Sequence, residues 1–176
     1  MNDKRQLLIH FLAALAYRTQ KALRDAPQEF AGFRIGDGVR SPAELVRHMT
    51  SVLGYARTHF VGGRYWPEPL PLFEEEIARF HDMLEKLGQH LKNEDPLLEG
   101  MSEERLLQGP FSDAMTHAGQ LAMLRRLAGA PVPPENFIVA EIHWERLGAD
   151  QSRPVSPDQS WSESPPGWQP PAPGEE

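Results

Sequence analysis

Residues 113–129 of the chain read Asp113-Ala-Met-Thr-His117-Ala-Gly-Gln-Leu-Ala-Met-Leu-Arg-Arg-Leu-Ala-Gly129. Apolar residues recur here with helical spacing, which predicts a helix from about residue 111 to residue 128. Gly129 suits the left-handed conformation that commonly ends a helix. Asp113 and His117 stand one turn apart on one helix face, about 6 Å along the axis, where both can reach a single metal ion.

Three other segments carry an apolar stripe with the same period, at residues 3–25, 41–61 and 73–91. The second begins with Ser41-Pro-Ala-Glu44, in which Ser41 and Glu44 match a capping box and the proline suits the first helical position. Convincing strand alternation is nearly absent. Four striped helices joined by loops favour an all-α fold, a four-helix bundle in which facing helices build metal sites.

Composition and charge exclude several classes of partner. The formal net charge is −7 and the 18 Lys and Arg residues are scattered, so no nucleic-acid partner is expected. The chain has no cysteine, so a metal would be held by imidazole and carboxylate groups. No run approaches the roughly 20 apolar residues of a membrane span, and no signal peptide is recognisable. We therefore expect no membrane partner and a cytoplasmic location.

The chain divides into a domain at residues 1–149 and a tail at residues 150–176. Within the first part, residues 136–144 are apolar enough to form a short C-terminal segment that packs against the bundle, but too few for periodicity to separate strand from helix. The tail is rich in proline and serine and is expected to be flexible, with Trp161 and Trp168 as residues that dock on a surface.

The third metal ligand is expected from the second helix, where His48 lies at the flank of the apolar stripe. Asp113 and His117 fall on the apolar face of the last helix, so we expect both to point towards the core. The alternative is that Asp113 lies in the first helical turn, where the dipole favours a carboxylate, and makes an ordinary contact with His117.

Other polar residues are weaker candidates. Tyr55 and His59 lie on the same flank as His48, where they either line a pocket or pack at the bundle edge. His143 is an outside candidate for a further ligand. Solvent exposure is expected for the remaining histidines and for the glutamates at the start of the third helix, namely His10, His81, His90 and Glu74, Glu75 and Glu76.

Two motifs carry a family resemblance: Ser41-Pro-Ala-Glu-Leu-Val-Arg-His48, and Thr116-His117-Ala-Gly-Gln120 with the leucine-arginine run that follows it. Over residues 3–145 the chain resembles the DinB-like superfamily and the related thiol transferases that use mycothiol or bacillithiol. The resemblance implies a bundle that holds a divalent metal through three histidines. His48 matches the first ligand and His117 the last, while Asp113 stands where the family usually has histidine.

The function implied by this resemblance is that of a metal-dependent enzyme acting on a small molecule. A mononuclear divalent ion (zinc, nickel, iron or manganese) would activate water or a low-molecular-weight thiol, for hydrolysis or thiol transfer. Tyr55 or His59 would shuttle a proton. Aspartate is a legitimate ligand beside two histidines, and it shifts the expected metal preference away from nickel. The alternative is a non-catalytic binding or structural module in which Asp113 marks a lost metal site.

A homodimer is the expected assembly, because members of the resembled family often form one and twofold dimers are the commonest closed form. The last helix carries small residues and methionines on the face turned away from Asp113 and His117, which permits close packing against a partner. These residues are Met115, Gly119, Ala122 and Met123. The alternative is that the third helix or residues 136–144 cover this face within one chain.

Overall fold

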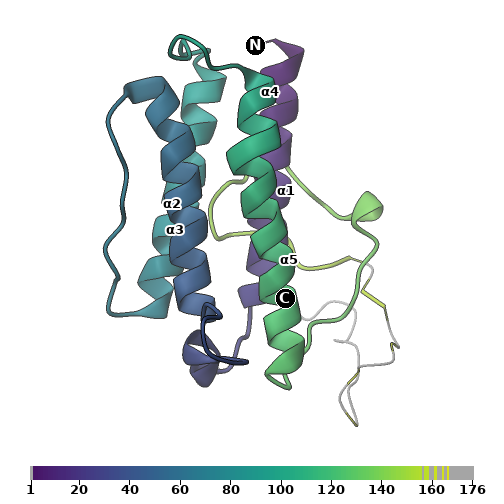
Figure 1. The fold of residues 1–176 in the computed structure, drawn as a ribbon. Helices are drawn as coiled ribbons and strands as arrows, with labels where there is room; N and C mark the ends of the chain where they lie inside the picture. The colour runs from purple at the N-terminus through teal and green to yellow at the C-terminus, as the bar shows by residue number, and fades with distance from the viewer. Residues whose placement is uncertain (1, 156, 159–160, 162–163, 165, 167–176) are drawn as a thin grey trace.

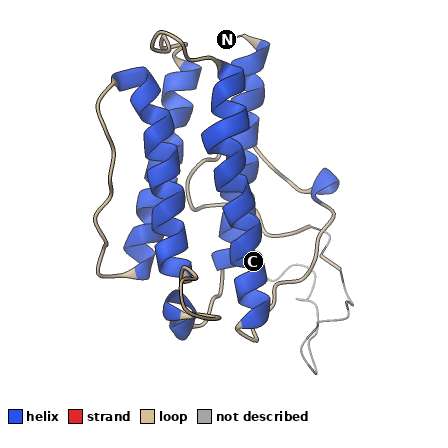
Figure 2. Ribbon diagram, in the orientation of Figure 1, coloured by secondary structure: helices blue, strands red, loops and turns tan. Residues whose placement is uncertain are grey.

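The structure, a computed structural model, describes residues 2–155, 157, 158, 161, 164 and 166. It contains four long helices, α1 (Asp3–Leu23), α2 (Pro42–Val61), α3 (Phe73–Lys92) and α5 (Ser112–Leu127), and the short α4 (Glu103–Leu106). Figure 2 shows helices and loops, and no strand occurs in the described part of the chain. The all-α prediction is therefore confirmed.

The long helices pack side by side around one core. Helix α1 contacts α3 and α5, and α2 contacts the same two helices (Figure 1). Arg5 at the start of α1 donates to Glu103 at 3.0 Å, and Arg125 at the end of α5 donates to the carbonyl of Ala22 at 3.0 Å. Helices α1 and α5 therefore run in the same direction.

Helices α2 and α3 also run parallel to each other. Near their starts, Arg47 lies 3.5 Å from Glu76, and near their ends the rings of Phe60 and His90 stack at 5.1 Å. The connector, residues 62–72, runs along the outside of the helices from the end of α2 back to the start of α3 (Figure 1). A fully extended connector spans about 36 Å, which exceeds the roughly 30 Å length of a 20-residue helix. It is therefore long enough to run the whole length of α2.

Local signals set the helix ends as expected. The hydroxyl of Ser41 accepts from the amide of Glu44, and the Glu44 carboxylate accepts from the amide of Ser41 at 2.9 Å, which completes the predicted capping box. Gly62 and Gly129 end α2 and α5 with φ of +76° and +75°. The core between the helices is apolar, with fully buried side chains such as Leu12, Met49, Leu84 and Leu121.

The last long helix, α5, begins at Ser112, within one residue of the start that the sequence predicts, and the short helix α4 precedes it. Helical turns start at Glu103 and continue through a π turn at Leu107–Phe111 into α5. Gly109 has the non-helical angles φ −96° and ψ −105°, and Pro110 supplies no amide hydrogen. The carbonyl of Leu107 accepts from both the backbone amide and the hydroxyl of Ser112, the hydroxyl at 2.6 Å. Gly109 and Pro110 therefore mark a kink between α4 and α5.

Two residues of α3 that we expected to be exposed are buried. Glu76 is 1% exposed, and its carboxylate accepts from the amide of Leu70 and from Arg79. His81 is 3% exposed and donates from Nδ1 to the carbonyl of Leu147 at 3.0 Å. The partners come from the connector and from the chain beyond α5, so the pattern of α3 alone did not indicate them.

The chain beyond α5 lies against α1. Glu135, whose side chain is fully buried, accepts from the hydroxyl of Tyr17 at 2.7 Å and from Lys21 at 3.0 Å. A short 3₁₀ turn follows at Phe137–Val139, and the ring of Phe137 packs edge-on against Tyr17. Further along, the carbonyl of Gln151 accepts from Arg24 at 2.6 Å.

The apolar side chains beyond α5 are only partly buried. Of residues 136–144, Ile142 packs against the core, whereas Ile138 is 88% exposed, so the segment packs only in part. Trp161 is partly buried, and Trp168 lies outside the described residues.

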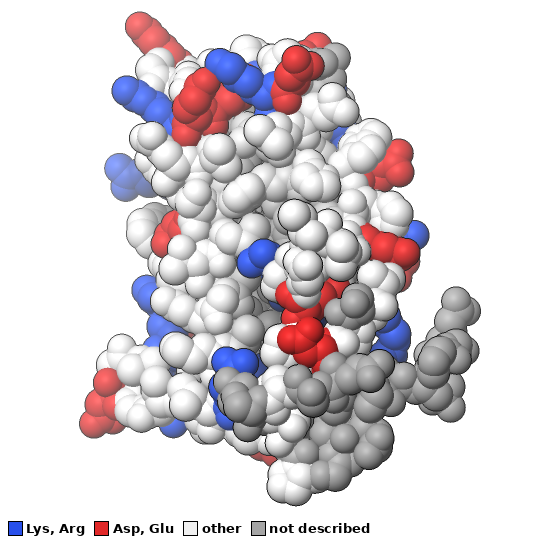
Figure 3. Space-filling view, turned by 90° about the vertical axis from the view of Figure 1, so that its right-hand side faces the viewer, with Lys and Arg blue, Asp and Glu red and all other residues white. Residues whose placement is uncertain are grey.

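The surface carries both charge signs. Figure 3 shows acidic and basic side chains interspersed over one face of the molecule, without a continuous basic stripe on that face. None of the helices in the described part has the length and hydropathy needed to cross a membrane.

Candidate metal centre

The structure brings together the three residues that the sequence proposes as ligands. His48 comes from α2, and Asp113 and His117 come from α5; one ligand atom of each lies within 4.8 Å of the others. The two imidazole rings meet edge to face, with centroids 4.8 Å apart. Over the described residues this is the one group of three such side chains close enough to hold an ion. His143 is exposed and lies outside it.

Burial differs among the three side chains. His117 is 8% exposed, and His48 is partly buried beside the core residue Met49. Asp113 does not point into the core as expected, because its side chain is 51% exposed in the first turn of α5. Its carboxylate oxygen lies 3.4 Å from Nε2 of His117. An exposed carboxylate carries little desolvation cost, so the charge of Asp113 does not need a bound cation to offset burial.

The protonation of His117 is set by a neighbour one turn along α5. Its Nδ1 lies 2.8 Å from the side-chain carbonyl oxygen of Gln120. A carbonyl oxygen only accepts, so in the neutral ring Nδ1 carries the hydrogen and Nε2, on the side of Asp113, has the lone pair. Metal-binding histidines are typically held by such an acceptor on the other ring nitrogen. Sequence reasoning gave Gln120 no role, although its spacing of three from His117 was a usable signal.

The surroundings of His48 favour its neutral imidazole form. Burial lowers the pKa of His48 from its ordinary value of 6.5, and the positive charge of Arg40 and the neighbouring His117 lower it further, against the opposing effect of Asp113. His48 is therefore neutral at pH 7, and a neutral imidazole is the form that binds a metal.

The donor set fits a divalent metal ion. Two imidazole nitrogens and one carboxylate oxygen leave further coordination positions open. Ligands about 2.1 Å from a tetrahedral ion are about 3.4 Å from each other, and Asp113 and His117 already meet this separation. A pair 4.8 Å apart would close by about 1.4 Å, which a side-chain rotation at the half-exposed Asp113 or at His48 can supply.

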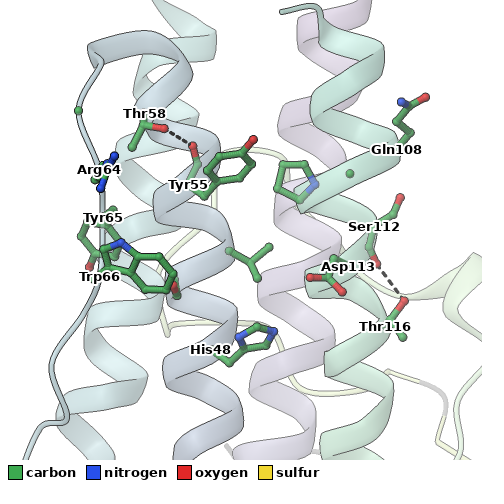
Figure 4. Close-up of a pocket in the computed structure, with 15 residues that line it drawn as sticks. His48, Tyr55, Thr58, Arg64, Tyr65, Trp66, Gln108, Ser112, Asp113 and Thr116 are labelled. Atoms are coloured by element: carbon green, nitrogen blue, oxygen red, sulfur yellow. Dashed lines mark hydrogen bonds between the residues drawn. The ribbon is translucent and has the colours of Figure 1, made fainter.

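Two of the three residues, His48 and Asp113, line a cavity of about 940 Å³ between α2, the connector and α5. Figure 4 shows His48 on α2 facing Asp113 on α5, with Tyr55 farther along α2 and Trp66 on the connector. His48 and Asp113 line this cavity, whereas the more deeply buried His117 is not among its described lining residues. A ligand in the cavity would therefore meet the proposed centre from the side of His48 and Asp113.

Tyr55 and His59 occupy different positions relative to this cavity. Tyr55 is 56% exposed and lines it. His59 is absent from the described lining residues, and its ring meets that of Tyr55 edge to face at 4.7 Å. Nε2 of His59 is buried without a hydrogen-bond partner in the described structure. Tyr55 can touch a ligand directly, and His59 can act only through Tyr55.

The connector is fixed over the cavity by close packing. The ring of Tyr65 lies directly on Gly54 of α2, where a Cβ atom would be 1.9 Å from Cδ1 of the ring. Farther along, Arg79 donates to the carbonyl of Glu68 at 2.8 Å, and Leu70 donates to Glu76 at 2.9 Å. Trp66 is therefore held between two anchored points of the connector.

Comparison of the chain with protein-family models, with curated proteins and with solved structures gave no match.

Proposed function

We propose that the protein is a DinB-like four-helix bundle that binds one divalent metal ion through His48, Asp113 and His117, and that it acts on a small molecule. The observation that carries this proposal is the meeting of three ligand atoms within 4.8 Å at the end of a large cavity. The parallel pair α2 and α3, joined by a long connector, gives a bundle in which residues of α2 and α5 face each other.

When bound, the metal ion would supply a Lewis acid that lowers the pKa of a water molecule or a low-molecular-weight thiol, for hydrolysis or thiol transfer. Gln120 fixes the tautomer of His117, so that Nε2 is free of hydrogen. Tyr55 lines the cavity and could relay a proton there. His59 supports the ring of Tyr55 and has no direct contact with the cavity.

One observation favours the alternative, a binding or structural module without a metal. The contact of 3.4 Å between Asp113 and His117 joins residues four apart on a helix, an ordinary geometry for a polar pair. In that case His48 and His117 are simply edge-to-face rings at the end of the cavity.

Metal content distinguishes these two functions. We expect about one equivalent of a divalent metal after purification without chelator, and its loss in His48→Ala and in His117→Ala. His10→Ala is the matched control, because His10 is exposed and lies outside the cluster. Metal retained in both site variants, or absent from the folded native protein, would reject the proposal. A screen of thiol and electrophile pairs would then define the reaction.

We include a homodimer in this proposal, although only part of the expected face of α5 is open to a partner. Gly119 and Ala122 line a cavity of about 220 Å³ together with Phe137 of the same chain, so the chain itself covers part of the expected face. Met115 packs against the core, and Met123 is 47% exposed. A partner would therefore contact the side of α5 that carries Met123.

A further inference from the structure

A second cavity adjoins the one that contains the proposed metal centre. It has a volume of about 270 Å³ and shares His48, Ser51 and Trp66 with the larger cavity. Its remaining walls come from the first part of α2, from the loop before it and from the connector: Arg40, Glu44, Arg47 and Pro67. The two cavities therefore form one groove that passes His48.

Of the charged residues that line the smaller cavity, Arg40 is the one without an ion pair in the described structure. Glu44 is paired with Arg34 at 2.5 Å, and Arg47 lies 3.5 Å from Glu76. Arg40 makes no hydrogen bond or ion pair with any residue that the structure describes. Arg40 lines the smaller cavity together with His48, one of the proposed ligands. In a chain with a net charge of −7, this is a local positive site.

The wider part of the groove is lined by Arg64 and Asp113 and also offers aromatic surface. Trp66 is 82% exposed and Tyr55 is 56% exposed, yet both line the cavity, together with Val52 and Pro110. Because Tyr65 packs on Gly54, the neighbouring Trp66 is held at the wall. Small-molecule sites typically combine such apolar and aromatic walls with a few placed polar groups.

We propose that the groove binds a carboxylate that bears an aromatic group. The aromatic ring packs against Trp66 and Tyr55, and the carboxylate accepts from Arg40, whose planar guanidinium matches it in a bidentate pair. The bond that joins ring and carboxylate then lies beside His48, which lines both cavities. This inference rests on the proposed function, since it takes the metal centre as the place where the ligand reacts.

Calorimetric titration of the full chain with 2-naphthoate tests the inference. The protein is treated with a chelator, so that binding is measured without a metal. Two matched probes separate the contributions: 2-naphthalenemethanol keeps the ring without the charge, and acetate keeps the carboxylate without the ring. We expect 2-naphthoate to bind at least about tenfold more tightly than either probe. Equal affinity for 2-naphthoate and the alcohol, or no binding of 2-naphthoate, would overturn the inference.

Variants assign the two ends of the ligand. Arg40→Gln should weaken 2-naphthoate about tenfold and leave the alcohol unchanged. Arg64→Gln is the matched control, because Arg64 lines the larger cavity but not the smaller one, and it should change the affinity by less than about twofold. Trp66→Ala should weaken both aromatic probes, about fivefold. A loss in Arg64→Gln with none in Arg40→Gln would refute the assignment of Arg40.

The failure of this inference can be told apart from that of the proposed function. Binding of 2-naphthoate that depends on Arg40, in a protein that takes up no metal, would reject the metal centre and leave the carboxylate site standing. Stoichiometric metal without 2-naphthoate binding, in either the chelated or the loaded protein, would reject the carboxylate site alone.

Discussion

Replacing Gly54 with alanine tests how the connector is held against α2. The new Cβ would lie 1.9 Å from Cδ1 of Tyr65, so the ring must retreat by about 1.5 Å to reach the 3.4 Å of ordinary van der Waals contact. Overpacking of this kind costs about 1–3 kcal/mol. Alanine in a helix interior returns about 1 kcal/mol relative to glycine. The free energy of unfolding should therefore fall by roughly 0–2 kcal/mol.

Two control variants make this prediction decisive. Gly119→Ala on α5 meets no atom within 4 Å, so it should show the helix-propensity gain alone and stabilise the protein by about 1 kcal/mol. In a Tyr65→Ala background the obstruction is gone, and Gly54→Ala should become stabilising by a similar amount. Urea unfolding of the four proteins and the native chain measures these differences. If Gly54→Ala alone stabilises as much as Gly119→Ala, the close packing of Tyr65 on Gly54 is refuted.

Three further predictions concern single positions. Burial lowers the pKa of His81 below the unfolded value of 6.5. The contribution of His81 to stability is therefore complete above about pH 6.5 and is lost as the pH falls towards the lowered pKa. Between pH 7.5 and 5.5 the native protein should lose more unfolding free energy than His81→Asn, and an equal loss would contradict this. Asp113→His should tighten nickel or zinc binding in competition titrations with a chelator, and an unchanged affinity would count against Asp113 as a ligand. Sedimentation at micromolar concentration should show a dimer that Met123→Glu weakens, because Met123 is 47% exposed on the side of α5 that the chain does not cover, whereas a monomeric native protein would exclude the dimer.

Much of the helical framework is readable from the sequence because it depends on local signals. The capping box at Ser41 and the glycines after α2 and α5 act within one turn, and the structure places these helix ends where they predict. The meeting of His48 with His117 also follows from their places on two stripes that face one core.

What the sequence did not reveal depends on segments that carry no periodicity. A helical stripe reports which face of a helix is apolar, but not which loop covers its other faces. Glu76 and His81 appeared exposed on that basis, and the connector and residues near Leu147 bury them. The opposite error occurred at Asp113, which lies on the apolar face but so near the start of α5 that solvent reaches it.

The connector separates the parts of the chain that hold the fold from the part that would select a ligand. Between the contact of Tyr65 with Gly54 and the hydrogen bond from Arg79 to Glu68, the chain contributes Trp66 and Pro67 to the groove, and neither belongs to a helix. Substitutions at these two positions can therefore reshape the groove while the packing of α2 against α3 stays as it is. In evolution or in the laboratory, this short span is where a new ligand preference can arise at little risk to folding.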